Sequence, residues 1–345
     1  MFFDALPNEI ITHVFLSLLD ISSAVALSET SHRFYNAFHS SKKLIILSQA
    51  AEAEFGPLDD ITQIVTQNAS QRAHIHRNVP LSDALLHQTV KVGRVAQKWE
   101  EIYPFKKWKN DYANRRLLTS SERYIIRRAI YRLWLFSKAF HNSSHVRTCR
   151  GIPEVVRERA ALLHNFSAIQ LAEMLDVHRV LRDMTANNIC PSNGKIRQKF
   201  QKRFPESNHQ LLFNIHLNYP PAPSTFVPDI GYYNSTIGSS KYHSRLQPSR
   251  WHEPGAEGWG DDISHYYVIE DMMKLDPESI LYLRDHCPLK RDVEGYVKNF
   301  GDWFQNNGET FVETLAFVIG QRCGNVEELK AAVEDGEMGA VVNEE

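Results

Sequence analysis

The chain has 345 residues, of which 43% are apolar and 11% aromatic, enough to bury one large core or two smaller ones. Its net charge of −2 argues against gross attraction to nucleic acid or to a membrane. The charge is unevenly distributed, because residues 251–345 hold seven Lys or Arg against 21 Asp or Glu, whereas residues 1–250 hold 32 against 20. The two parts can therefore attract each other or offer opposite charges to partners.

Cysteine content and apolar runs bear on the compartment. The four cysteines are far apart and form no C-x-x-C pair, which indicates neither a dense disulfide scaffold nor a cysteine zinc module. The start has no basic n-region, and polar residues soon interrupt the apolar stretch, unlike a signal peptide. No run approaches the roughly 18 apolar residues of a membrane helix. We expect no membrane association and a cytoplasmic or nuclear location.

Residues 6–38 predict three short helices with tight links. Pro7 lies near the start of the first, where a missing N–H costs little. Asp20 and Ser31 supply capping side chains for the second and third. An apolar stripe along the first helix recurs at steps of three and four residues and is formed by Ile10, Ile11, Val14, Phe15, Leu18 and Leu19.

Helical periodicity continues after residue 50, and strand-like alternation is scarce, so the predicted fold class is all-α. Thr119 and Glu122 predict a capping box, and Ser167 with Gln170 predicts a second. Pro277 suits a first helical turn after a cap at Asp276. The helices are expected over residues 58–71, 82–103, 119–141, 153–164, 167–185, 195–204, 277 onward, 293–304 and 311–323.

Residues 219–267 differ in texture, since Pro, Gly, Ser and Tyr dominate. Structureless loops this long are unusual inside a compact domain, yet the segment has too many aromatics for an ordinary linker. We expect an irregular loop partly packed on the body. Aromatic side chains dominate interaction hot spots, which makes this loop a candidate client-binding region, although the same side chains can serve only to anchor it. The candidates are Tyr232, Tyr233, Trp251 and Trp259.

The run Leu-Pro-x-Glu-Ile-Ile-x-x-Val-Phe-x-x-Leu at 6–18, followed by Ser-x-Thr-Ser-His-Arg-Phe-Tyr at 28–35, resembles the F-box family. The resemblance implies a three-helix F-box over residues 1–48 that docks on a Skp-family adaptor and, through it, on a cullin. It assigns adaptor contact, or support of that contact, to Leu6, Pro7, Ile10, Val14, Phe15, Leu18 and Phe34. A plain helical hairpin packed on the rest of the chain is the alternative that periodicity alone favours.

The remaining chain is expected to form a helical domain over residues 49–333, followed by a frayed acidic tail over 334–345. The Arg-rich run at 122–134 looks like a helix that recurs in uncharacterised F-box proteins of filamentous fungi. By resemblance, the chain is the substrate receptor of an SCF-type ubiquitin ligase with an unknown client. The alternative is a scaffold that binds the adaptor without a ubiquitylated client.

Residues 91–132 hold twelve basic and four acidic residues, interleaved with aromatics. Such a segment can bind nucleic acid, phosphates or an acidic peptide. The helix expected over 119–141 has an apolar face formed by Ile126, Ile130, Leu133, Trp134 and Phe140, together with Ser137. Arg123, Arg127 and Arg128 fall opposite or beside this face, as on a solvated helix face. An intramolecular partner in the acidic C-terminal third is the preferred alternative, and nucleic acid is the least expected partner.

No motif for catalysis or cofactor binding is present in the sequence. The i, i+4 spacing of His141, His145 and Cys149 would align three zinc ligands on a helix, but the intervening Asn-Ser-Ser predicts a helix end. Carboxylates at 261–262 and 270–271 match no calcium loop. We therefore predict no catalytic residue, no metal site and no cofactor, in a non-catalytic receptor subunit.

Overall fold

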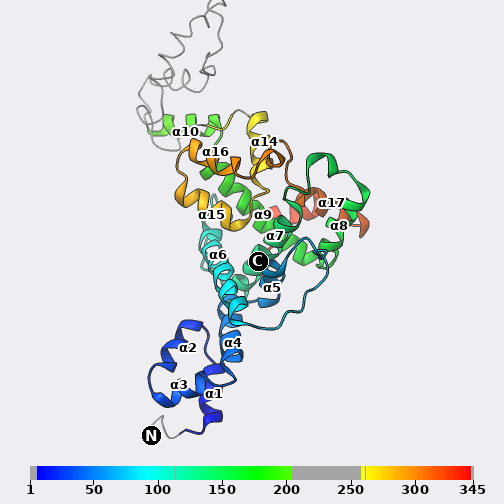
Figure 1. Cartoon of the computed structure of the whole chain (residues 1–345). Helices are drawn as coiled ribbons and strands as arrows, with labels where there is room; N and C mark the ends of the chain where they lie inside the picture. The colour runs from blue at the N-terminus through cyan, green and yellow to red at the C-terminus, as the bar shows by residue number, and fades with distance from the viewer. Residues whose placement is uncertain (1–5, 113, 204–257, 261, 343–345) are drawn as a thin grey trace, which may run out of the picture. The chain divides into compact units, whose positions relative to one another are not determined.

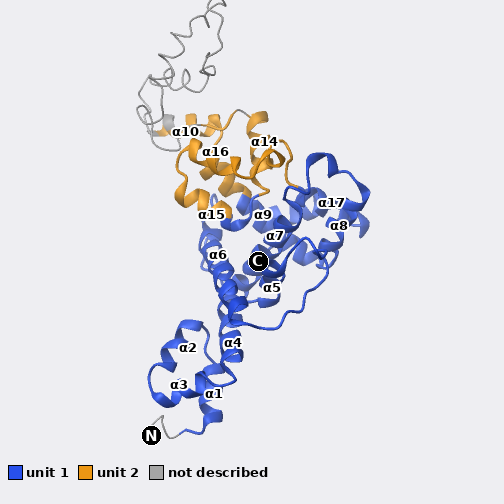
Figure 2. Cartoon of the chain, in the orientation of Figure 1, with its two compact units in different colours: residues 1–181, 275–278, 310–345 blue, residues 182–274, 279–309 orange. Residues whose placement is uncertain are grey.

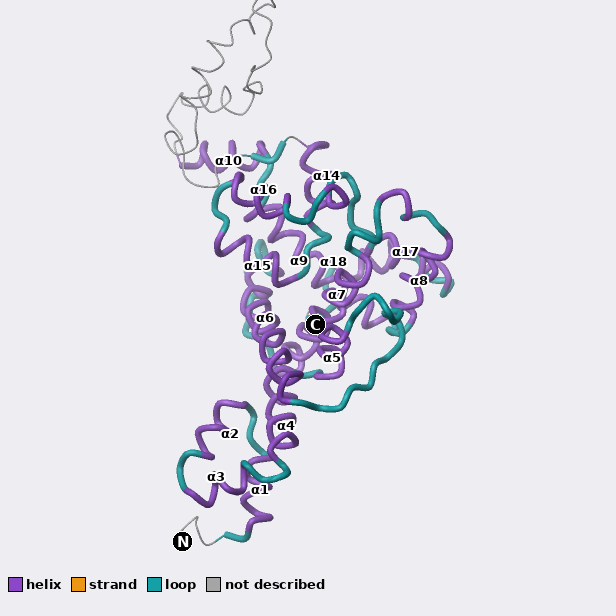
Figure 3. The backbone as a smooth tube through the Cα atoms, viewed as in Figure 1, coloured by secondary structure: helices purple, strands orange, loops and turns teal. Residues whose placement is uncertain are grey.

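The computed structural model describes residues 6–112, 114–203, 258–260 and 262–342. This part of the chain is helical and has no strand, which confirms the all-α class (Figures 1 and 3). It forms two compact units (Figure 2). Unit 1 holds residues up to 181 together with 275–278 and 310 onward, and unit 2 holds the described residues of 182–274 and 279–309.

Unit 1 is built mainly from the first nine helices and the last two. Its α-helices are α1 Asn8–Leu16, α2 Ile21–Ser28, α3 His32–Phe38, α4 Lys43–Phe55, α5 Leu58–Thr66, α6 Asp83–Lys107, α7 Ser120–Phe140, α8 Pro153–His164, α9 Ala168–Met184, α17 Phe311–Gln321 and α18 Val326–Glu334. Helix α9 ends a few residues beyond the boundary of this unit.

Unit 2 begins with a π-helical turn at Thr185–Ile189 that continues α9. Its other helices are α10 Asn193–Arg203, α14 Asp262–Met272, most of α15 Pro277–His286, α16 Lys290–Lys298 and the 3-10 helix η5 Asp302–Phe304. Val293 to Phe304, expected as one helix, is therefore divided between α16 and η5. The aromatic loop was expected to extend to residue 267, but helix α14 begins at residue 262, so the prediction is wrong for the last residues of the loop.

Short-range capping explains where several helices begin. Asp20 accepts a hydrogen bond from the Ser23 N–H at 2.6 Å, and the Ser31 hydroxyl accepts one from the Phe34 N–H. Both predicted capping boxes are present, one at Thr119 and one at Ser167. These bonds satisfy N–H groups that have no partner inside the helix.

Helix α7 lies at the centre of unit 1. Its predicted apolar face is buried, including Ile126, Ile130 and Trp134. Tyr131 and Phe136, outside that face, are buried as well, so most of the helix circumference is covered. A helix buried on nearly all sides is a core helix rather than a surface one.

Helix α4, which the sequence did not single out, connects the start of the chain to this core. It contacts α1 and α2 and also packs on α6. At its end, the Phe55 carbonyl accepts a hydrogen bond from the Tyr131 hydroxyl at 2.7 Å, and the next carbonyl, of Gly56, accepts one from Arg127. Residue 48, the expected end of the F-box, lies inside this helix.

The end of the chain is packed, not frayed, as far as residue 342. Ala340 and Val341 are buried, and the Ala340 N–H donates to the Asp176 carboxylate at 3.0 Å. The expected fraying of the acidic tail is wrong for residues 334–342, because the buried Ala340 and Val341 side chains and the hydrogen bond from the Ala340 N–H to Asp176 hold the chain in place.

Candidate functional site

Helices α1, α2 and α3 form a small group, here called the N-terminal trio, beside α4 (Figure 1). Its core is aromatic: the Phe15 ring centroid lies 6.1 Å from that of Phe34 and 5.5 Å from that of Phe38. Ile11 and Ala24 complete this core, and all five side chains are at most 5% exposed. Phe15 and Phe34 therefore support the trio from inside and offer no surface to a partner.

The remaining residues assigned by the F-box resemblance lie nearer the surface. Pro7 and Ile10 are exposed, Ile10 by 46%, whereas Leu6, Val14 and Leu18 are partly buried. The apolar stripe of the first helix is thus divided, with Ile11 and Phe15 turned inward and Ile10 turned outward. An amphipathic pattern cannot distinguish these two roles when both faces are apolar.

The trio exposes further large apolar side chains that the sequence did not assign to a partner. Leu19 is 74% exposed, Tyr35 49% and Val25 40%. They follow or lie on three different helices of a segment of about 30 residues, which is a high density for a surface. The signal available in the sequence was the excess of apolar residues over what so short a trio can bury.

Of the candidate client-binding residues, Trp259 is described, whereas Tyr232, Tyr233 and Trp251 lie outside the described residues. Short backbone hydrogen bonds fix Trp259: its N–H donates to the Pro191 carbonyl at 2.9 Å, and the Asn193 N–H donates to the Gly260 carbonyl at 3.0 Å. The Lys290 ammonium lies 5.0 Å from the indole centroid, a cation–π contact.

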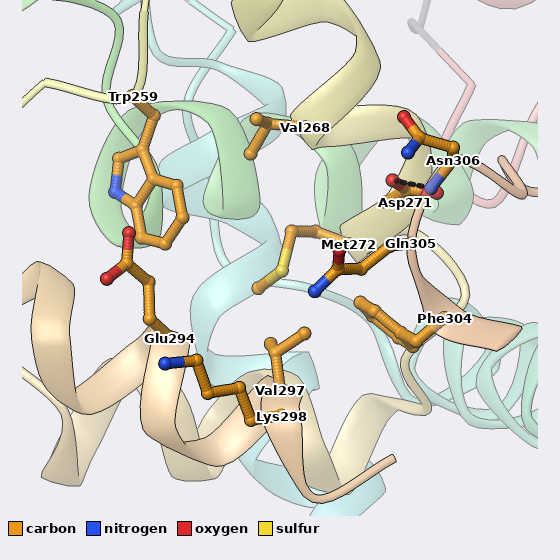
Figure 4. A pocket seen from close by; sticks show the side chains of 10 residues that line it. All are labelled: Trp259, Val268, Asp271, Met272, Glu294, Val297, Lys298, Phe304, Gln305 and Asn306. Carbon is orange, nitrogen blue, oxygen red and sulfur yellow. Dashed lines mark hydrogen bonds between the residues drawn. The ribbon is translucent and has the colours of Figure 1, made fainter. Parts of the chain in front are cut away.

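Trp259 lines a pocket of about 440 Å³ in unit 2. Figure 4 shows Trp259 and Glu294 on one side and Phe304 with Gln305 opposite, with Met272 between them. The pocket lies between α14 and α16, and five of its ten lining residues are polar or charged. Its lining residues are Trp259, Val268, Asp271, Met272, Glu294, Val297, Lys298, Phe304, Gln305 and Asn306.

Two acidic residues beside this pocket have structural partners. Asp271 accepts backbone hydrogen bonds from Asn306, Asn307 and Gly308 at 2.8 to 3.0 Å, so its charge orders the turn after η5. Glu270 pairs with Arg182 at 2.7 Å. The carboxylates that the sequence grouped together therefore serve two separate local contacts.

Three basic residues of α7 form ion pairs within unit 1. Arg127 binds Glu100 at 2.8 Å, Arg128 binds Glu173 at 2.7 Å, and Arg132 binds Asp60 at 3.1 Å. The expected solvated face is wrong for Arg127, which is 8% exposed. The expected partners in the C-terminal third are wrong for these three arginines, whereas Lys91 of the same basic segment does pair with Glu278, at 3.1 Å. Burial raises the pKa of Glu100 and of Asp60, while the paired arginines oppose that effect.

The spaced histidines do not converge. His141 Nε2 accepts a hydrogen bond from the Thr310 N–H at 3.2 Å and lies 3.2 Å from the Thr310 hydroxyl. His145 contacts the Asn142 side chain, and Cys149 lies in the separate 3-10 turn Arg147–Cys149. Within the described ranges, no group of three or more His, Cys, Asp or Glu side chains could hold a metal ion.

No described helix is both long and apolar enough to cross a bilayer. Comparison with family models finds no match, and neither do comparisons with curated proteins or with solved structures.

Proposed function

We propose that the N-terminal trio is an F-box that binds a Skp-family adaptor, and that the rest of the chain presents a bound client to a cullin-type ubiquitin ligase. The observation that carries the proposal is that the trio has both its own buried core and a set of exposed apolar side chains. An aromatic core holds three helices together, while Ile10, Leu19, Val25 and Tyr35 remain exposed. These side chains are 40 to 74% exposed, so covering each contributes on the order of 1 kcal/mol, and several together support docking.

Helix α4 supports the second half of the proposal. A receptor needs a firm connection between its adaptor-binding region and the body that follows it. The Ile21 N–H donates to Glu54 near the end of α4 at 3.0 Å, and Phe55 and Gly56 are bound by α7. One helix is therefore fixed to the trio and to the helical core of unit 1.

The adaptor surface is tested by pull-down of a purified Skp-family adaptor with the intact chain and with Ile10→Glu and Leu19→Glu. Each variant places a charge on an exposed apolar position, and we expect at least a roughly tenfold loss of binding. Ile169→Glu is the matched control, because Ile169 on α9 is 64% exposed and lies outside the trio. Circular dichroism should be unchanged in all three variants.

Two results would overturn the adaptor proposal. Failure of the intact chain to bind the adaptor would reduce the trio to a packed N-terminal element. Alternatively, Ile169→Glu could reduce binding as much as the trio variants do. Phe15→Ala is unsuited to this test, since removing a core ring costs about 3 to 5 kcal/mol and unfolds the surface along with its support.

We assign client binding to the pocket beside Trp259. A pocket that combines apolar side chains with several polar and charged groups can receive a side chain of a partner. Val268→Glu introduces a charge into this lining and should abolish ubiquitylation of the client while adaptor binding persists. Tyr267→Glu is the control, since the neighbouring Tyr267 is 60% exposed and does not line the pocket.

The proteins that co-purify with the adaptor distinguish the ligase proposal from the scaffold alternative. Cullin and ring-finger components that co-purify with the intact chain, and are lost with Ile10→Glu, support the ligase. Co-purification of the adaptor alone supports a scaffold without a ubiquitylated client.

A further inference from the structure

The end of α6 and the connection to α7 expose three large apolar side chains within thirteen residues. Phe105 is 63% exposed, Tyr112 73% and Leu117 87%. Isolated exposed apolar residues are normal on protein surfaces, but a group of them in one short segment indicates an interaction surface. This segment belongs to unit 1 and lies outside both the trio and the pocket beside Trp259.

Arg115 is held between two of these side chains. Its guanidinium carbon lies 4.7 Å from the Phe105 ring centroid and 5.6 Å from the Tyr112 ring centroid. Such contacts attract the cation to the rings and restrict an otherwise flexible side chain. The guanidinium is therefore ordered before any partner binds, which lowers the entropic cost of binding.

Arg115 and its neighbour Arg116 have different surroundings. Arg116 donates two parallel hydrogen bonds to the Glu122 carboxylate, at 2.8 and 2.6 Å. Arg115 has no acidic partner within the described part of the chain. The Arg115 guanidinium is thus available to donate two parallel hydrogen bonds to the carboxylate of a partner, as Arg116 does to Glu122.

The charge of the segment fits an acidic partner. Between Phe105 and Leu117 the chain carries five Lys or Arg and one acidic residue, Asp111. Inside the protein, Lys107 is paired with Asp176 and Arg116 with Glu122. Arg115 carries its positive charge beside the exposed Phe105 and Tyr112 side chains.

We propose that Phe105, Tyr112, Arg115 and Leu117 form a docking surface for an acidic peptide segment of a partner protein. An Asp or Glu carboxylate of that segment accepts hydrogen bonds from Arg115, and its apolar side chains cover Phe105 and Leu117. A single-stranded nucleic acid fits less well, because its bases need free ring faces and here Arg115 already occupies faces of Phe105 and Tyr112. The surface does not depend on the adaptor proposal.

The test is fluorescence anisotropy with the full chain and a labelled pool of short peptides that combine Asp and Glu with Leu and Phe in varied order. A second pool replaces Asp and Glu by Asn and Gln, and labelled oligouridylate of matched charge serves as the nucleic-acid probe. The variants are Arg115→Ala, Arg115→Lys and, as control, Arg157→Ala. Arg157 is exposed and pairs only with Glu154 one turn away among the described residues.

We expect the acidic pool to bind and the neutral pool to bind at least tenfold more weakly, with a loss of affinity as salt rises from about 50 to 200 mM. Arg115→Ala should weaken binding by roughly tenfold or more, and Arg115→Lys nearly as much, because an ammonium lacks the planar fork. Arg157→Ala should leave the affinity unchanged. Thermal unfolding should be the same for all variants, since Arg115 is on the surface.

Three outcomes would overturn the proposal. The acidic pool could fail to bind, it could bind equally well to Arg115→Ala, or oligouridylate could bind more tightly in an Arg115-dependent manner. The last result would assign the surface to single-stranded nucleic acid.

Discussion

Glu122 closes the first turn of α7 through two different groups. Arg116 donates two hydrogen bonds to its carboxylate, and the Thr119 N–H donates a third at 2.7 Å. These donors favour the ionised form, so the pKa of Glu122 lies below its ordinary value of 4.5, with the hydrogen bond from Arg116 as the largest cause. A capping side chain of this kind contributes about 1 kcal/mol to the free energy of unfolding.

The sign of the pH dependence follows from the lowered pKa. Because the folded protein binds this proton less tightly than the unfolded chain, the stabilisation is fully present above pH 4.5 and is lost as the pH falls through the folded-state pKa. Glu122→Gln should lower the free energy of unfolding by about 1 kcal/mol at neutral pH and by less below pH 4.5. Urea unfolding across this range measures both effects.

Glu154→Gln is the control for Glu122, because the exposed Glu154 pairs only with Arg157 in the described chain. Exposed pairs one turn apart contribute little to stability. If Glu122→Gln destabilised the protein equally at neutral and acid pH, the ionised carboxylate would not be the stabilising group.

At the scale of elements, the contact between α4 and α6 depends on Gly93 of α6, which has no side chain. A Cβ added to Gly93 would lie 2.4 Å from the Phe55 ring, and Phe55 is 1% exposed and cannot move freely. We expect Gly93→Ala to lower the free energy of unfolding by about 1 to 3 kcal/mol, since overpacking outweighs the better helix propensity of Ala.

Gly295→Ala in α16 provides the opposite case. No atom lies within 4 Å of its added Cβ, and the residue lies inside a helix. The substitution should raise the free energy of unfolding by up to about 1 kcal/mol. Thermal unfolding of both variants checks the pair, and equal effects in the same direction would mean that packing on Phe55 does not decide the result.

At the scale of the whole molecule, Asp176 connects segments that are far apart in the chain. Its buried carboxylate accepts hydrogen bonds from the Tyr103 hydroxyl at 2.5 Å, from Lys107 at 2.8 Å and from the Ala340 N–H at 3.0 Å. Burial, followed by the Asp176 charge, raises the pKa of Tyr103, so the phenol remains protonated and donates. Gly339 also belongs here, because a Cβ at this position would lie 2.5 Å from the carboxylate.

Asp176→Asn should therefore lower the free energy of unfolding by about 2 to 4 kcal/mol, since it leaves the Lys107 ammonium without its counter-charge in a buried site. Hydrogen exchange at residues 338–342 should become faster than in the unmodified chain. Asp111→Asn, at an exposed position, is the control. Unchanged exchange near Ala340 in Asp176→Asn would show that apolar burial alone holds this end.

Elements whose causes are local could be predicted from the sequence. The boundaries of α8 and the caps of α2, α3, α7 and α9 were predictable, because each depends on side chains within about four residues of the bond that they make. The same holds for the all-α class. In the candidate sites, Ile10 and Trp259 were named from the sequence, whereas the exposed Leu19 and Arg115, held between two rings, were not assigned to a site.

Which apolar and charged side chains face inward depends on long-range packing. Phe15 is buried and Ile10 exposed although both belong to one apolar stripe, and Arg127 is buried although its helix position suggested solvent. The packed end of the chain belongs to the same class, since Ala340 meets a carboxylate 164 residues earlier. Such contacts join segments that are distant in sequence, and no periodicity or spacing encodes which segments will meet.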